Sequence, residues 1–362
     1  MTRPKLPLLI RTISLTLVVW LHSGCYLVTQ AGFFLGDQLT ARPAHRVYED
    51  PRTTAETHDF LALVRDILEF AEQEIGLDRS SNFTRYIATE RTSVAYVVSA
   101  TKEFSFETYR RKFPFVGEVP YLGFYRRPAA DRFAAQLMTQ GYDVWVRGVG
   151  AFSTLGYFSD PLYSYMARYP LHRLANMLIH ELAHATLWIP GEVGFNEQYA
   201  TIIGDEGARQ YILSRHGAES EQYRVLEDSA VDSVLYRADM LELRTRLSEL
   251  YAESHLDEDS MRRAKQRIIT DHQQEFAAAY DERYRSEGYR RYPELEVNNA
   301  YLSLFGLYTQ DLSYFYHLYE LLGFDLAALV DAFRDLPSSD LAPNEYLQTL
   351  IIKHSSAAYP ET

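Results

Sequence analysis

Two histidines and a glutamate form the pattern His180-Glu181-Leu182-Ala183-His184, an H-E-x-x-H. The run from residue 171 to residue 187 is predicted to be helical, and positions four apart on a helix are offset by only about 40°. The two imidazoles can therefore converge on one metal ion. Glu181 would then stand beside the metal, where its carboxylate can take a proton from a polarised water as that water attacks a carbonyl group.

The elements around this helix contain a second acid. Pro190-Gly191 and Gly194 end the first helix, and a second helix is predicted from about residue 195 to residue 211. It begins with Phe195-Asn196-Glu197-Gln198-Tyr199-Ala200, which resembles the F-N-E-x-x-A third-ligand motif of gluzincin metallopeptidases. The resemblance implies that Glu197 completes a Zn²⁺ site with His180 and His184. The short loop lets the second helix lie antiparallel to the first.

The resemblance extends along most of the chain, from about Cys25 to residue 335. The sequence resembles the bacterial predicted aminopeptidase family, whose members are lipoprotein-like zincins. The matching segments, besides the two helices, are Phe113 to Gly123, Gly141-Tyr142-Asp143-Val144, Ala151 to Gly156 and Asn298-Asn299-Ala300. This similarity implies a zinc metallopeptidase that acts on peptides, and it supports metallopeptidase more firmly than aminopeptidase.

One position departs from the gluzincin pattern. Thermolysin-like gluzincins carry an Asp four residues after the ligand glutamate, where it orients the first histidine, but this chain has Thr201 there. Asp205, two turns past Glu197, could orient the histidine instead. Alternatively, Asp205 is an acidic residue with a purely structural place near the end of the helix.

The substrate is expected to lie as an added strand along a sheet edge above the metal helix, as in other zincins. The segment from Val149 to Phe158 is the candidate edge, with Ala151, Phe152, Ser153 and Thr154 at its centre. The alternative is that this segment is only a loop that connects the strand of Trp145 to the helix.

A developing oxyanion needs a hydrogen-bond donor besides the metal, and Tyr308 is the candidate, with His317 behind it. The alternative, which the presence of 28 tyrosines favours, is that Tyr308 has only a packing role. An aminopeptidase also needs an anion for the substrate's α-ammonium group. Glu118 and Glu192 are candidates for that anion, or ordinary surface acids.

The other histidines are predicted to be solvated on polar helix surfaces rather than metal ligands. They include His172, His216, His255 and His272.

The N-terminus resembles an export signal. Basic residues precede the apolar run from Ile13 to Leu21, and small residues then precede Cys25, the single cysteine of the chain. The site resembles the lipobox of bacterial lipoproteins, although His22 stands where an aliphatic residue is usual. We expect residues 1–24 to be removed and Cys25 to be lipidated. Tyr26 after the cysteine favours the periplasmic side of the outer membrane. The alternative is an ordinary signal peptide with an incidental cysteine.

The whole chain is predicted to be α+β. Of its 362 residues 47% are hydrophobic, which allows a large core, and the formal net charge of −13 argues against nucleic-acid binding. After the signal we expect an anchor and wrap at residues 25–53, a zincin-like core at 54–215 with a small mixed sheet, a charged helical hairpin at 216–290 and C-terminal helices at 291–362. The hairpin could engage a protein partner.

These observations predict a lipid-anchored zinc metallopeptidase of the cell envelope, with aminopeptidase as the first choice. The sequence also allows two alternatives. One is a zincin-fold scaffold or binding protein without turnover, and the other is an envelope endopeptidase.

Overall fold

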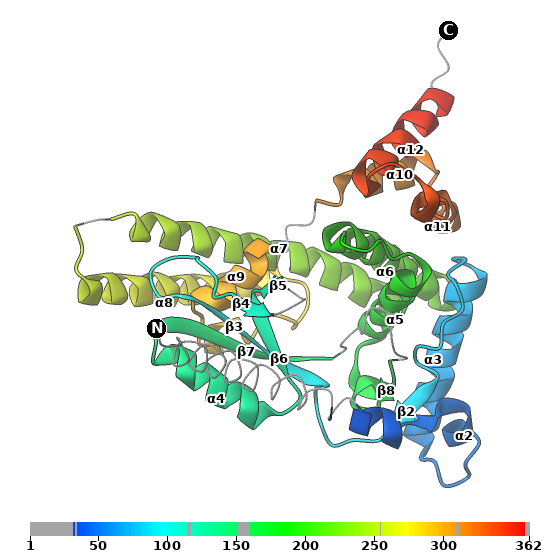
Figure 1. Ribbon diagram of the computed structural model, residues 1–362, viewed down its shortest axis with the longest axis horizontal. Coiled ribbons are helices and arrows are strands. Elements are labelled where there is room, and N and C mark those ends of the chain that lie inside the picture. The colour runs from blue at the N-terminus through cyan, green and yellow to red at the C-terminus, as the bar shows by residue number, and fades with distance from the viewer. Residues whose placement is uncertain are drawn as a thin grey trace, which may run out of the picture.

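The computed structural model describes residue 32 and residues 35–113, 117–150, 160–253, 255–307 and 311–358. Its fold is α+β, as predicted, and 62% helical with small mixed sheets. Across these ranges, none of the helices is both long and apolar enough to cross a membrane. Figure 1 shows the order of the elements along the chain.

The helices are α2 (Ala44–Tyr48), α3 (Ala55–Gln73), α4 (Arg127–Met138), α5 (Leu171–Thr186), α6 (Val193–His216), α7 (Glu221–Tyr251), α8 (Glu258–Arg283), α9 (Asn299–Leu307), α10 (Ser313–Leu321), α11 (Leu326–Ala332) and α12 (Pro343–Ala358). The strands are β1 (Arg42–Pro43), β2 (Arg85–Ile87), β3 (Ala95–Lys102), β4 (Arg111–Phe113), β5 (Gly117–Val119), β6 (Tyr121–Phe124), β7 (Tyr142–Val149) and β8 (Leu162–Tyr163).

The largest sheet has the order β6-β3-β7, and both pairings are antiparallel. Successive side chains of a strand point to opposite faces. Val98 and Ala100 of β3 accordingly enter the apolar core beneath α4, whereas Thr101 bonds Ser303 of α9 on the other face, with their hydroxyl oxygens 3.2 Å apart. Helix α4 thus covers one face and α9 the other, which explains why β3 is buried on both (Figure 1).

The main core joins α3, α5 and α6. Buried leucines and isoleucines of α5 pack against α3 and α6, and Gly207 of α6 lets α6 approach Ile179 closely. A Cβ at residue 207 would lie 2.8 Å from Ile179 Cγ2, closer than real contacts allow. The close packing of α5 on α6 fixes the relation between the two helices that carry the candidate site.

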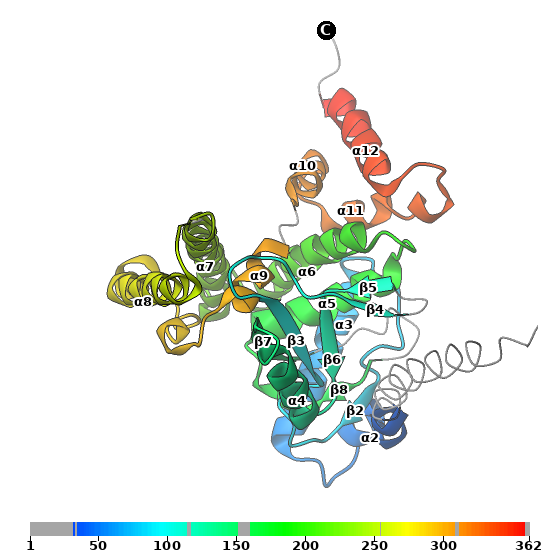
Figure 2. The same cartoon turned by 60° about the vertical axis from the view of Figure 1, so that its left-hand side comes forward.

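Helices α7 and α8 lie side by side and extend away from the rest of the molecule (Figures 1 and 2). Each begins with a side-chain cap, Ser220 for α7 and Asp257 for α8. The pair is tied to the sheet by a buried ion pair in which Lys265 Nζ lies 2.5 Å from Asp143 Oδ2. The division of the chain into segments at residues 53, 215 and 290 stays a prediction.

One local expectation needs correction. His272 is buried rather than solvated, with its Nδ1 atom 2.8 Å from the hydroxyl of Tyr292. Burial lowers the pKa of His272. The cause is tertiary: Tyr292, which follows α8 in the chain, packs against His272 and Phe276 and covers a face of α8 that looks polar from its sequence.

Candidate metal site

Helix α5 places His180 and His184 one turn apart on its C-terminal half. Its apolar face is anchored in the main core, where Leu174 and Leu178 are almost fully buried. The centres of the two imidazole rings lie 4.7 Å apart, and the ring planes are nearly perpendicular at 88°. His184 is further packed edge-on against Trp188, with ring centres 5.6 Å apart.

The loop from α5 to α6 is short and internally bonded. Gly191 has a φ of +87°, a conformation that glycine adopts without strain. The buried side chain of Asn196 accepts a hydrogen bond from the backbone N–H of Ile189 (2.9 Å) and donates one to the Ile189 carbonyl (2.8 Å). Asn196, the asparagine of the F-N-E-x-x-A pattern, therefore holds the loop against the first turn of α6 and fixes the position of Glu197.

Helix α6 returns along α5 in the opposite direction. Its start brings Glu197 to His184, and two turns later Asp205 lies against Asn176 near the start of α5. Gly204 makes this approach possible, because a Cβ there would meet His180 Cβ at 3.0 Å and the Asn176 carbonyl at 3.2 Å. The antiparallel arrangement expected from the short loop is present.

The three side chains converge. Glu197 Oε1 lies 3.4 Å from His184 Nε2, and Glu197 Oε2 lies 3.7 Å from His180 Nε2. One potential ligand atom from each residue lies within 4.8 Å of the others. Nitrogen and oxygen ligands about 2.0–2.2 Å from a tetrahedral Zn²⁺ would be about 3.3 Å apart, so this donor set and its spacing fit that ion.

The electrostatics follow from the same contacts. Burial opposes the charged form of His180, but Glu197 and then Glu181 outweigh it and raise its pKa. Hydrogen bonding from His180, and then from His184, lowers the pKa of Glu197 to about 2. Glu197 is therefore ionised at neutral pH, in the state that a metal ligand requires.

Glu181 is buried on α5 next to the site, at 9% exposure. It does not belong to the cluster of possible ligands, which consists of the two histidines and Glu197. A buried carboxylate beside a metal site, but outside the ligand set, is placed as a general base would be.

The structure places Asp205 on the expected face of α6, but with a different partner. Its Oδ1 accepts a hydrogen bond of 2.6 Å from Asn176 Nδ2. No hydrogen bond joins Asp205 to His180 within the described ranges, although its charge contributes to the raised pKa of His180. Asn176, one turn before His180, thus donates to the Asp205 carboxylate that we expected to orient the histidine.

Several predicted residues lie outside the described residues, namely Cys25, Ala151, Phe152, Ser153, Thr154 and Tyr308. The side chain of Glu118 is likewise not described. Glu192 is exposed at the start of α6, and His317 is exposed on α10. The proposed roles of all these residues stay predictions.

One acidic residue near Glu181 was not anticipated. Asp160 stands two residues before β8, and the charge of Glu181 contributes to its electrostatic environment. Its sequence context, Ser159-Asp160-Pro161, resembles an ordinary turn, so the local sequence gives only a weak indication that Asp160 lies near the candidate site. Its relation to Glu181 is visible only in three dimensions.

An α+β chain with a convergent His-His-Glu cluster on two adjacent helices is a candidate metal-dependent enzyme. Comparison with protein families makes this more specific, since the family model described as "Putative aminopeptidase" matches residues 26–346. The chain belongs to this family. No curated protein and no solved structure matches the chain.

Proposed function

We propose that this protein is a zinc-dependent aminopeptidase of the bacterial cell envelope with a gluzincin-like catalytic core. The observation that carries the proposal is the convergence of His180, His184 and Glu197 within 4.8 Å, next to the buried Glu181. Membership of the "Putative aminopeptidase" family supports the peptidase class. His180, His184 and Glu197 would hold Zn²⁺, and three protein ligands leave the fourth position open to solvent or substrate.

A bound Zn²⁺ would supply Lewis acidity, which polarises the scissile carbonyl and lowers the pKa of a coordinated water towards 7. Glu181 would accept a proton from the attacking water as the oxygen bonds to the carbonyl carbon. It would then return that proton to the nitrogen of the breaking C–N bond. The second proton of the attacking water also passes to this nitrogen, so the products are a carboxylate and an ammonium group, and Glu181 regains its starting state.

The substrate backbone is proposed to add to the sheet as an extra strand. In the described sheet β7 pairs only with β3, and its other edge is proposed to form main-chain hydrogen bonds with the substrate beyond Val144, whose carbonyl already accepts a hydrogen bond from Asn298 Nδ2. β7 ends at Val149, and the residues proposed to bind the substrate, Ala151 to Thr154, follow shortly after it in the chain. Tyr308 is proposed as the additional oxyanion donor, because a phenol hydroxyl can donate a hydrogen bond to a developing oxyanion.

The proposed location rests on the N-terminal sequence, with Cys25 as the lipidated residue. The test is metabolic labelling with an alkyne fatty acid, followed by membrane fractionation. Wild-type protein should carry the label and sediment with membranes, whereas Cys25→Ser should lose both properties. A wild-type protein released without label would contradict the anchor and leave the peptidase proposal intact.

The decisive experiment combines metal analysis of the soluble chain with cleavage of a peptide mixture. We expect one zinc per chain and loss of activity on chelation. Glu181→Gln should retain the metal and lose about 10²–10⁴-fold in turnover, the usual contribution of a general base. Glu282→Gln, on the exposed side of α8, is the matched control and should behave as wild type.

Undiminished hydrolysis by Glu181→Gln would contradict the assigned base. A chain that binds zinc but cleaves no peptide would instead favour the scaffold alternative. Cleavage of N-blocked peptides only would indicate an endopeptidase.

A further inference from the structure

Asp160 is an acidic neighbour of the proposed general base. It is half-buried, and burial, followed by the charge of Glu181, raises the pKa of its carboxyl to about 7. Among the described residues, no donor forms a hydrogen bond or ion pair with this carboxylate. A partly desolvated acid beside a second acid is unfavourable unless a cation joins it.

The backbone of Asp160 is fixed from both sides. Its N–H donates to Asn82 Oδ1 (3.1 Å), and its carbonyl accepts from the N–H of Phe83 (2.7 Å). The loop that carries Asn82 is itself bonded to the end of α5, because the N–H of Asp78 donates to Thr186 Oγ1 over 2.9 Å. Asp160 is therefore held in place relative to α5.

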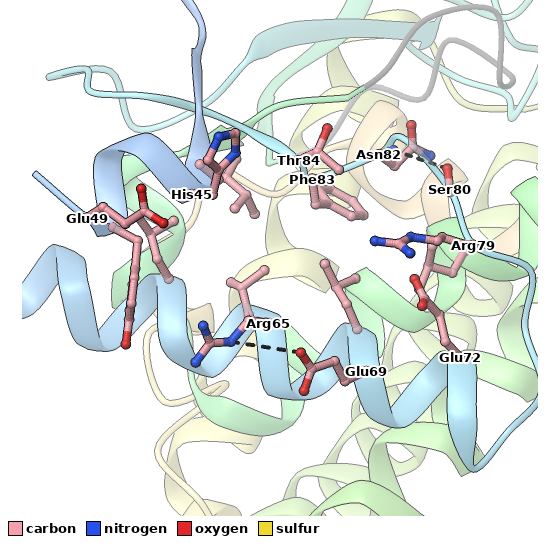
Figure 3. Close-up of a pocket in the computed structure, with 17 residues that line it drawn as sticks. His45, Glu49, Arg65, Glu69, Glu72, Arg79, Ser80, Asn82, Phe83 and Thr84 are labelled. Atoms are coloured by element: carbon pink, nitrogen blue, oxygen red, sulfur yellow. Dashed lines mark hydrogen bonds and ion pairs between the residues drawn. The ribbon is translucent and has the colours of Figure 1, made fainter.

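A nearby cavity of about 420 Å³ shows how close the two segments are. Leu162, two residues after Asp160, and Leu182, next to Glu181, both line it. Asn82 and Phe83 also line it and are visible at its upper side in Figure 3. The segment of Asp160, which leads into β8, thus passes the turn of α5 that carries Glu181, which accounts for the electrostatic interaction between their carboxylates.

This position suits one particular cation. In a peptide with a free N-terminus, the α-ammonium group is one carbon away from the scissile carbonyl of the first residue. An anion that binds this group must lie close to the base that activates the water, and a half-buried carboxylate binds a charged donor more strongly than an exposed one. Glu192, the candidate from sequence, is exposed at the start of α6.

Resting on the proposed peptidase function, we propose that Asp160 binds the α-ammonium group of the substrate and thereby restricts the enzyme to peptides with a free N-terminus. The required substrate class is a peptide or amino-acid amide with an unblocked amine. The side chain of the first residue takes no part in this contact, so even alanine substrates depend on Asp160.

The kinetic test compares Asp160→Asn with wild type on alanine p-nitroanilide and on an N-acetylated alanine peptide. We expect KM for the free amine to rise about 10–100-fold, the usual effect of losing a charged hydrogen bond, with a smaller change in kcat. Hydrolysis of the blocked peptide should not fall. Asp160→Glu should recover part of the loss, and Asp271→Asn, exposed on α8, is the matched control.

A binding measurement separates this inference from the peptidase function. The zinc-loaded protein is titrated with alanine hydroxamate and with N-acetylalanine hydroxamate. Wild type should prefer the free amine about tenfold or more, and Asp160→Asn should lose that preference. This result without any peptide cleavage would overturn the peptidase function and leave the role of Asp160 standing. Equal affinities in wild type, or unchanged KM in Asp160→Asn, would overturn the role of Asp160 alone.

Discussion

At the scale of single residues, the candidate site combines two kinds of carboxylate. Hydrogen bonding to two imidazoles lowers the pKa of Glu197 to about 2, whereas burial and then Glu181 raise the pKa of Asp160 to about 7. Glu197 has the character of an acid that stabilises the fold, because its neighbours favour the ionised form of its carboxyl. Asp160 has the opposite character, which is typical of residues kept for function at a cost in stability.

This contrast predicts how stability depends on pH. The pKa of Asp160 is about 7 in the folded chain, against 3.8 for an ordinary Asp. Between these values the folded state binds more protons than the unfolded state, so Asp160 lowers the free energy of unfolding as pH rises. We expect Asp160→Asn to stabilise the metal-free protein by about 1–3 kcal/mol near pH 8, and much less near pH 4, after allowance for partial solvent exposure.

Urea unfolding of chelated wild-type and Asp160→Asn protein across this pH range provides the measurement. Metal must be removed, because a bound cation would itself favour the ionised form of Asp160. A stability difference that stays constant with pH would show that Asp160 has an ordinary pKa in the folded chain.

At the scale of elements, the site depends on how closely two helices approach. The sequence predicts α5, the loop and α6 well, because the H-E-x-x-H pattern, the Pro-Gly break and the following helical segment are local signals. The convergence of His180, His184 and Glu197 was predictable from spacing and resemblance. The position of Asp160 was not, because it depends on contacts with Asn82, 78 residues away in the chain.

The close approach predicts the effect of adding side-chain volume at Gly204. Gly204→Val places methyl groups where a Cβ alone would already lie 3.0 Å from His180 Cβ, so α6 must move away from α5. We expect zinc affinity to fall about tenfold or more as Glu197 moves with its helix. Competition titration against a chromophoric chelator measures this.

Gly194→Val is the matched control, because it lies in the same helix with nothing within 4 Å of its Cβ position. It should bind zinc as wild type does. Unchanged zinc affinity in Gly204→Val would mean that α5 and α6 can adjust without disturbing the ligands.

At the scale of the whole molecule, distant segments meet through buried polar contacts that no local pattern reveals. Asp143 of β7 bonds Lys265 of α8 and also accepts a hydrogen bond of 2.8 Å from the N–H of Asn299. Asn299 Nδ2 in turn donates to the carbonyls of Lys102 and Glu103. These contacts join the sheet, the hairpin of α7 and α8, and α9. The sequence predicts the helices of the hairpin from their periodicity, but a lysine among many charges gives no sign of being buried.

The buried ion pair predicts that the hairpin can be loosened without loss of the metal site. Lys265→Met leaves Asp143, with 16% of its side chain exposed, without its counter-charge. Removing one partner of a fully buried pair costs about 3–5 kcal/mol, and we expect a smaller loss here because the N–H of Asn299 still donates to Asp143. We expect amide hydrogen exchange to accelerate along α8 and α9 while α5 and α6 stay protected and zinc remains bound.

Arg262→Ala, which removes an exposed partner of Glu103, is the control and should cost about 0–1 kcal/mol. Adding Asp143→Asn to Lys265→Met should recover part of the lost stability, because the unpaired charge is then gone. Simultaneous loss of protection in α5 and α6 would instead show that the hairpin and the metal-binding helices unfold as one unit.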